Sequence, residues 1–298
     1  MSKRIDWVDI AKGITILLVV LGHSLQGVVD SQGITLYSDH SSILLAKNAI
    51  YGFHMATFFA ISGFFVNFLS RPFFKELVLK IKRLVLPYFI WSFILAASMQ
   101  VASRYTNAGL GLKNFISSPV TPFSEYWYLY VLFFIFLAYL IVNLIFSKHT
   151  QIVMLSIGVI LFVLYPLLPN IWIIVNFSKY LFFFASGNFI FKYVNRLNFK
   201  KIKLNFWILL VCFVVVNCVY LLILKDSMIY QNYYYILTAS VGLLFVFYTS
   251  MLISKSKIIK LKKSLRLCGK NSMQIYVMHL LPLAGLRIIL LKMANIEN

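Results

Sequence analysis

Residues 4–24 read RIDWVDIAKGITILLVVLGHS, and the apolar part of this stretch continues to Val29. A run of about 20 apolar residues is long enough to cross the roughly 30 Å hydrocarbon core of a bilayer as an α-helix. His23, a titratable residue, stands deep within that run. The stretch therefore predicts a membrane helix that carries a polar group at depth. We expect it to be retained as an uncleaved first span, because no small-x-small cleavage pattern follows it.

Apolar runs of this kind recur along the chain. It has 298 residues, of which 61% are hydrophobic and only 12% are charged, whereas soluble domains carry about a quarter charged residues. We therefore expect an all-α, polytopic integral membrane bundle of about nine to ten transmembrane helices. It should form a single domain over residues 1–298, with a multi-pass location in the plasma (inner) membrane. The nine apolar spans are approximately 10–29, 45–69, 84–103, 126–146, 151–168, 171–191, 206–224, 234–253 and 271–291.

The distribution of basic residues predicts the orientation. A net charge of +20 would suggest a nucleic-acid partner in a soluble protein, but here the basic residues gather in short loops between apolar spans. Eighteen of the 28 Lys and Arg residues lie in alternate loops, the pattern that marks the cytoplasmic side. We therefore expect a cytoplasmic N-terminus, membrane lipids as partners and no nucleic acid. One such loop contains SKSKIIKLKK, residues 254–263, which we expect to be solvated and to face lipid headgroups.

The first helix carries its polar residues on one face. Lys12 and His23 are eleven residues apart, which places them on the same side of an α-helix with roughly 16 Å of rise between them. Asp9 falls within about 40° of that face. Ionisable residues inside a membrane face the bundle interior or a cavity and are candidates for function. The alternative is a structural histidine that makes an interhelical hydrogen bond.

Two further histidines stand at comparable depth in other spans. His54 lies halfway through the second span and His279 nine residues beyond Lys270. A shared polar cavity explains three such histidines more simply than three separate packing roles. We expect acid–base chemistry rather than a metal site, because no acidic partner or His-x-x-x-His pair accompanies them. Ser24 and Ser62 are candidate nucleophiles or donors, although serines at such positions also serve helix packing.

Several motifs resemble one protein family. The pair Lys12 and His23 matches an Arg/Lys-x10-His motif in the first helix of the membrane acyltransferase-3 family, especially its fucose 4-O-acetyltransferase-like branch. The segments FHMATFFAISGFF (53–65), KIKRLVLPYFIW (80–91), WYLYVLFF (127–134) and GKNSMQIYVMHLL (269–281) also resemble family segments. The chain departs from the pattern at Ala56, where proline is common, and at Lys80, where arginine is usual.

This resemblance implies an O-acyltransferase that moves an acyl group, usually acetyl from acetyl-CoA, to a hydroxyl of a sugar or polysaccharide, free or lipid-linked. Acetyl-CoA is then a donor substrate, and no metal is expected. Its phosphates would contact the basic residues at the cytoplasmic mouth, while the acceptor would approach along the outer segments 30–44 and 104–125. The candidate coenzyme-binding residues are Lys12, Lys80, Lys82 and Arg83.

Within that expectation, His23 is the general base that takes the proton of the attacking hydroxyl. Asp9 and Lys12 are expected to hold the cytoplasmic end of the first helix or the coenzyme in place. His54 or His279 is expected to stabilise or orient the reacting groups. A double displacement through an acylated histidine or serine is the second route.

Two other classes of protein are alternatives. A transporter or exporter of a sugar polymer would use the same cavity to move a polar substrate, with the histidines relaying protons. The sequence shows no paired interrupted helices or repeat symmetry of the usual transporter kind. A purely structural membrane subunit would leave the three histidines at mid-depth unexplained.

Overall fold

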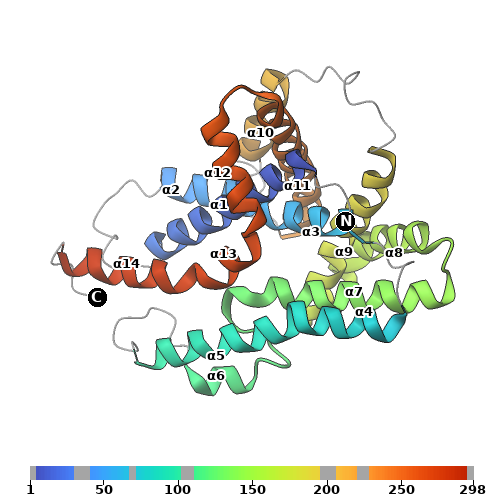
Figure 1. Ribbon diagram of the computed structural model, residues 1–298, viewed down its shortest axis with the longest axis horizontal. Coiled ribbons are helices and arrows are strands. Elements are labelled where there is room, and N and C mark those ends of the chain that lie inside the picture. Colours follow the sequence, from blue (N-terminus) through green and yellow to red (C-terminus); the bar gives the residue numbers. More distant parts are fainter. Residues whose placement is uncertain are drawn as a thin grey trace.

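A computed structural model describes residues 5–29, 41–66, 72–101, 111–194, 206–219 and 228–293. These residues form helices and connecting turns without a strand (Figure 1), which confirms the all-α fold. The α-helices are α1 (Asp6–Val29), α2 (Ser41–Tyr51), α3 (His54–Phe64), α4 (Phe73–Lys80), α5 (Leu86–Val101), α6 (Leu112–Ile116), α7 (Trp127–Ile145), α8 (Thr150–Leu164), α9 (Trp172–Val194), α10 (Phe206–Val219), α11 (Met228–Lys255), α12 (Ile259–Lys270), α13 (Ser272–Met278) and α14 (Leu280–Met293). A π-helical turn, η3 (Ile81–Val85), joins α4 to α5, and the 3₁₀ turns η5 (Ser124–Tyr126) and η6 (Tyr165–Leu167) flank α7 and α8.

Five continuous helical segments of the described chain are long and apolar enough to cross a membrane. They are Asp6–Val29, Phe73–Val101, Ser124–Ile145, Trp172–Phe191 and Tyr234–Lys255. The helices α8 and α10 are apolar but shorter. The prediction of a polytopic helical membrane bundle is thereby confirmed. The total of nine to ten spans, the cytoplasmic N-terminus and the single domain stay predictions.

Two of the predicted spans are interrupted in the structure, and Pro282 in the last span indicates that a division could occur there. The span 45–69 divides at Gly52 and Phe53, where the Phe53 amide donates to the Ile50 carbonyl oxygen at 3.2 Å and tightens the chain into a turn. The last span divides at His279, between α13 and α14. Pro282 follows closely, and since proline has no N–H it cannot bond to the carbonyl of Met278.

The last five residues of the segment expected to be a solvated loop, 259–263, form the start of the helix α12, which crosses α1 (Figure 1). Glycines make the close approach possible. A Cβ atom at Gly13 would overlap the carbonyl oxygen of Leu265, and one at Gly269 would overlap the carbonyl oxygen of Asp9. Small residues that let backbones touch are the usual means of helix association in lipid, where apolar burial gives little drive.

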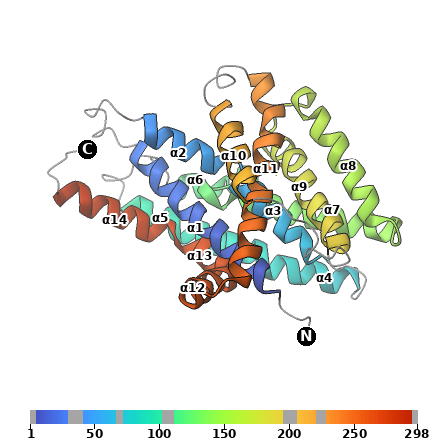
Figure 2. The same ribbon diagram turned by 90° about the horizontal axis from the view of Figure 1, so that it is seen from above.

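A second contact of this kind joins α3 to α9. A Cβ atom at Gly63 would overlap the Phe184 carbonyl oxygen, and one at Gly187 would overlap that of Ala60. Figure 2 shows α8 next to α9 and α10 next to α11. Because α3 contacts α9, α11 and α1, it lies inside the bundle. Ten of the eleven residues of α3 are buried, among them His54. The helices α1, α3, α7 and α13 thus converge in the interior.

Candidate active site

His23 is the centre of a polar cluster within the bundle. Its Nδ1 atom lies 3.0 Å from the hydroxyl oxygen of Tyr51 at the end of α2. Its Nε2 atom faces the carboxylate of Glu125 in η5, with 3.7 Å between Nε2 and Oε2. Only 9% of the His23 side chain is exposed, compared with 35% of that of Glu125. The imidazole is therefore held between a hydroxyl and a carboxylate.

The other two predicted histidines lie next to this cluster. The ring centroid of His279 is 5.1 Å from that of His23, and the ring of His54 is 5.0 Å from that of Tyr51. Both rings donate Nδ1–H to a backbone carbonyl oxygen, His279 to Tyr276 at 2.6 Å and His54 to Ile50 at 2.7 Å. This hydrogen bond leaves Nε2 of a neutral imidazole as an acceptor. The Nε2 atom of His279 is buried and has no hydrogen-bond partner within the described ranges.

The interrupted spans explain why three histidines from distant parts of the chain meet. His54 is the first residue of α3, directly after the break at Gly52 and Phe53. His279 stands at the break between α13 and α14. At these two breaks the carbonyl oxygens of Ile50 and Tyr276 accept hydrogen bonds from the two rings.

Glu125 was missed in the sequence, where its neighbours suggested only an aromatic belt at the membrane surface. It follows Ser124, whose φ of 47° is in the left-handed region that is uncommon for residues other than glycine. Its backbone carbonyl oxygen accepts a hydrogen bond from the Tyr276 hydroxyl. The Tyr126 hydroxyl donates to the carbonyl oxygen of Val277 at 2.9 Å. Two tyrosines therefore fasten the start of α7 to α13, and the left-handed residue directs the carboxylate to His23.

These contacts suit an imidazole that gains and returns a proton. A protonated imidazole donates from both nitrogens. At His23 the Tyr51 oxygen would accept one of these hydrogens, and the Glu125 carboxylate faces the other. The carboxylate also stabilises the positive charge, as the buried acid does in a Ser-His-Asp triad. The geometry therefore supports general-base chemistry at His23.

Comparison with known proteins agrees with this chemistry. A protein-family model described as an acyltransferase domain matches residues 5–294. The chain belongs to the membrane acyltransferase-3 family. The match confirms the resemblance seen in the motifs, and it shows that the chain contains an acyltransferase domain of this family.

A curated relative of this acyltransferase is the nodulation protein NolL of Sinorhizobium fredii (strain NBRC 101917 / NGR234). The two sequences are 32% identical over 134 residues, which cover 43% of this chain and 34% of NolL. The matched part of the chain thus spans about a third of the length of that relative. No solved structure matches the chain.

The predicted coenzyme residues of the acyltransferase lie away from the histidines. The Lys12 ammonium is 4.4 Å from the centre of the Phe65 ring, three turns of α1 before His23. The Lys80 ammonium is 3.3 Å from the Glu76 carboxylate and 3.7 Å from the centre of the Phe136 ring.

These two lysines are at corresponding distances from the His–Glu pair. Lys12 precedes His23 by eleven residues, and Phe136 follows Glu125 by eleven residues, so each lysine is roughly 16 Å along a helix from one half of the His–Glu pair. Lys82 and Arg83 are exposed in the π-helical turn η3. Asp9 is buried where α12 crosses α1, with 8% of its surface exposed.

The two candidate serines have other partners. The Ser24 hydroxyl donates to the carbonyl oxygen of Val20 in its own helix at 3.0 Å. The Ser62 hydroxyl is 2.8 Å from that of Tyr128 on α7. Neither serine is hydrogen-bonded to a histidine in the described part of the chain, so the geometry favours His23 over a serine as the reacting group. The described segments also contain no group of three His, Cys, Asp or Glu side chains placed to hold a metal ion.

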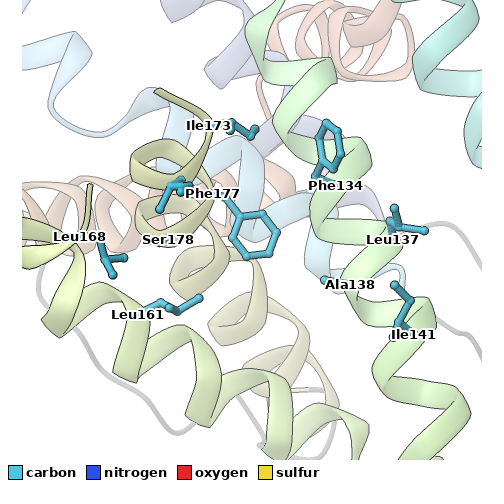
Figure 3. Close-up of a pocket in the computed structure, with 10 residues that line it drawn as sticks. Phe134, Leu137, Ala138, Ile141, Leu161, Leu168, Ile173, Phe177 and Ser178 are labelled. Atoms are coloured by element: carbon cyan, nitrogen blue, oxygen red, sulfur yellow. The ribbon is translucent and has the colours of Figure 1, made fainter. Parts of the chain in front are cut away.

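An apolar cleft of about 460 Å³ lies between α7, α8 and α9 (Figure 3). Its lining comprises Phe134, Leu137, Ala138, Ile141, Leu161, Leu168, Ile173, Ile174, Phe177 and Ser178. None of these side chains titrates, and none of the predicted site residues is among them. The cleft is therefore suited to hydrocarbon rather than to acyl transfer.

Proposed function

We propose that the chain transfers an acetyl group from acetyl-CoA to a hydroxyl of a cell-surface sugar or polysaccharide, free or lipid-linked. The observation that carries this proposal is the position of His23 between Tyr51 and Glu125, beside His279. A base with a carboxylate behind it is what activation of a weakly acidic sugar hydroxyl requires. The family supports acyl transfer as the class of reaction, and the cluster supports the His23 imidazole as the general base.

In the proposed reaction, His23 takes the proton as the hydroxyl oxygen attacks the thioester carbonyl carbon. Tyr51 accepts a hydrogen bond from Nδ1–H of His23, so that Nε2 takes the proton, and the Glu125 carboxylate, 3.7 Å from Nε2, stabilises the imidazolium that forms. The buried Nε2 of His279 is available to accept a hydrogen bond from a neighbouring hydroxyl of the acceptor. The tetrahedral intermediate then collapses, and its C–S bond breaks. His23 returns the proton to the leaving sulfur, which gives the acetyl ester and free coenzyme A. The imidazole ends the cycle neutral, as it began.

The donor would enter from the cytoplasmic side of the plasma membrane. Lys12, Lys80, Lys82 and Arg83 would hold its phosphates, since charge-assisted hydrogen bonds suit phosphate oxygens. The roughly 16 Å between the level of Lys12 and that of His23 would be crossed by the long neutral arm of the coenzyme. The acceptor would enter from the opposite side. Residues 30–40 and 104–110 of the expected acceptor-facing segments lie outside the described residues.

A transfer assay tests the proposal. The purified chain in lipid nanodiscs is mixed with radiolabelled acetyl-CoA and a panel of sugars, glycan fragments and lipid-linked sugars, and labelled ester is counted after removal of the donor. We expect label on at least one acceptor, with an equal amount of coenzyme A released. Release of coenzyme A by wild type and His23→Gln alike, without labelled acceptor, would contradict the proposed transfer.

A further inference from the structure

Arg287 in α14 is a charged residue that the proposed reaction does not use. Its guanidinium lies against α1 at Gly27, where a Cβ atom would be 3.8 Å from Nη1 and 4.0 Å from Cδ of the arginine. Gly27 is four residues after His23, so it lies one turn further along the same face of α1. A helical side chain leans over the turn before its own Cα atom. The guanidinium therefore lies next to the position that a side chain at residue 27 would take, about one helical turn from His23.

The hydrogen-bonding capacity of Arg287 is not satisfied. Its Nε atom is buried and has no hydrogen-bond partner within the part of the chain that the structure describes. Arginine stays protonated in proteins and has five N–H donors. A buried donor on a charged group costs free energy when it is unpaired, so such atoms call for an explanation. A ligand oxygen at this position would supply one.

The described carboxylates are engaged elsewhere. Glu125 faces His23, Asp6 is 2.9 Å from Arg266, and Glu76 is 3.3 Å from Lys80. Asp9 lies eighteen residues before Gly27, roughly 27 Å along α1. Among the described residues, then, no carboxylate neutralises Arg287. Within the described part of the chain, a bound anion would balance this charge.

We propose that Arg287 binds a phosphate group of the acceptor, one helical turn beyond His23. The inference rests on the proposed function and narrows its acceptor to phosphate-bearing sugars or phosphate-linked glycans. The planar guanidinium can donate two parallel hydrogen bonds to phosphate oxygens, which fixes the orientation as well as the position of the ligand. The phosphate would thus hold a sugar hydroxyl near Nε2 of His23. The small residue at position 27 leaves room beside the guanidinium, and an added Cβ atom alone would not fill it, since it would be 3.8 Å from Nη1.

Binding of inorganic phosphate tests the site without requiring turnover. Thermal unfolding of the purified chain in a phosphate-free maltoside detergent is followed as phosphate is added, with saturating coenzyme A present to fill the donor site. Sodium chloride at equal ionic strength is the reference. We expect saturable stabilisation by phosphate. In Arg287→Gln the half-maximal concentration should rise about 10- to 100-fold, since hydrogen bonds to charged groups are at stake, and Arg287→Lys should lie between.

Three matched variants separate this site from general charge effects. Lys113→Gln removes an exposed cation of α6 and should leave the phosphate response unchanged. Gly27→Ala fits, because its Cβ atom would be 3.8 Å from Nη1, and should also respond normally. Gly27→Leu keeps the arginine but fills its space, so it should weaken phosphate binding as Arg287→Gln does.

The proposal would be overturned if phosphate did not stabilise the wild-type chain saturably. It would also be overturned if Arg287→Gln responded to phosphate as wild type does. A membrane phospholipid could offer the same phosphate chemistry, and native mass spectrometry distinguishes it. Phospholipid that stays bound to wild type at saturating phosphate but is lost from Arg287→Gln would identify a headgroup site and overturn the acceptor assignment. Failure of the proposed function would be seen separately, as a chain that binds phosphate through Arg287 but does not bind acetyl-CoA.

Discussion

Replacement of Glu125 by glutamine tests the carboxylate that faces His23. The change keeps the shape of the side chain but removes its charge, 3.7 Å from the Nε2 atom of His23. Two unit charges at that distance attract by about 4.5 kcal/mol at an effective dielectric constant of 20 and by about 1.1 kcal/mol in bulk water. Because 35% of the Glu125 side chain is exposed, the loss should lie between these limits.

If the reaction passes through a protonated His23, removal of the Glu125 charge raises the free energy of the transition state by the amount of attraction that is lost. At 1.36 kcal/mol for each factor of ten, kcat for acetyl transfer should fall about 10- to 1,000-fold. The affinity for acetyl-CoA should not change, because the proposed donor site is roughly 16 Å away along α7. Steady-state transfer assays give kcat, and isothermal titration of the purified protein gives the donor affinity.

A matched control removes a carboxylate that belongs to another pair. Asp6→Asn breaks the ion pair with Arg266, whose two side chains are 50% and 34% exposed, and should leave kcat within about twofold of wild type because exposed pairs contribute little. Near-normal turnover in Glu125→Gln would refute the role of the carboxylate. A weaker donor affinity with unchanged kcat would refute it equally, since Glu125 would then belong to the donor site.

Other variants test the neighbouring contacts. Tyr51→Phe keeps the aromatic ring but removes the hydroxyl that lies 3.0 Å from Nδ1 of His23, so kcat should fall about 3- to 10-fold for one hydrogen bond; unchanged turnover would show that the hydroxyl has no part in the reaction. Arg83→Gln should weaken acetyl-CoA binding about 10- to 100-fold in isothermal titration, and Arg83→Lys should recover part of it because it keeps the charge without the planar fork; unchanged affinity would remove Arg83 from the donor site. Gly269→Ala places a Cβ atom against the Asp9 carbonyl and should destabilise the α1–α12 crossing by about 1 to 3 kcal/mol, whereas Gly285→Ala, which meets nothing within 4 Å, should unfold at the wild-type temperature. Equal unfolding temperatures for the two glycine variants would contradict the close crossing.

The positions of the membrane helices could be predicted from hydropathy because their apolar runs are long. The first span, expected over residues 10–29, is the helix Asp6–Val29. The break before His54 was not predictable in this way, because apolar residues continue through it, whereas Pro282 indicates that the last span could divide. The helix α12 was also missed, since its lysines lower the mean hydropathy. Its apolar positions at Leu261, Leu265 and Cys268 do follow helical spacing on one face, and that signal was available.

The residues of the candidate site also include some that could be predicted from the sequence and some that could not. His23, His54 and His279 could be predicted because a titratable ring at depth in a membrane span stands out by itself. Tyr51 and Glu125 could not, since a tyrosine or a glutamate at the end of an apolar run is common at membrane surfaces. Their roles depend on turns that bring α2 and η5 to α1. Arg287 was visible in the sequence, but only its approach to Gly27 relates it to His23.

We propose that the chain acetylates a hydroxyl of a surface sugar with His23 as the general base. Mass spectrometry of surface glycans tests it most directly, in cells that lack the gene and carry either the wild-type chain or His23→Gln at equal membrane abundance. Glutamine keeps a hydrogen-bonding side chain but cannot act as a base near pH 7. The account predicts that wild type adds one acetyl mass to a glycan unit and that His23→Gln adds none, with the same amount of glycan at the surface. Acetylated glycan in the His23→Gln cells, or a loss of surface glycan without any change of mass, would contradict it.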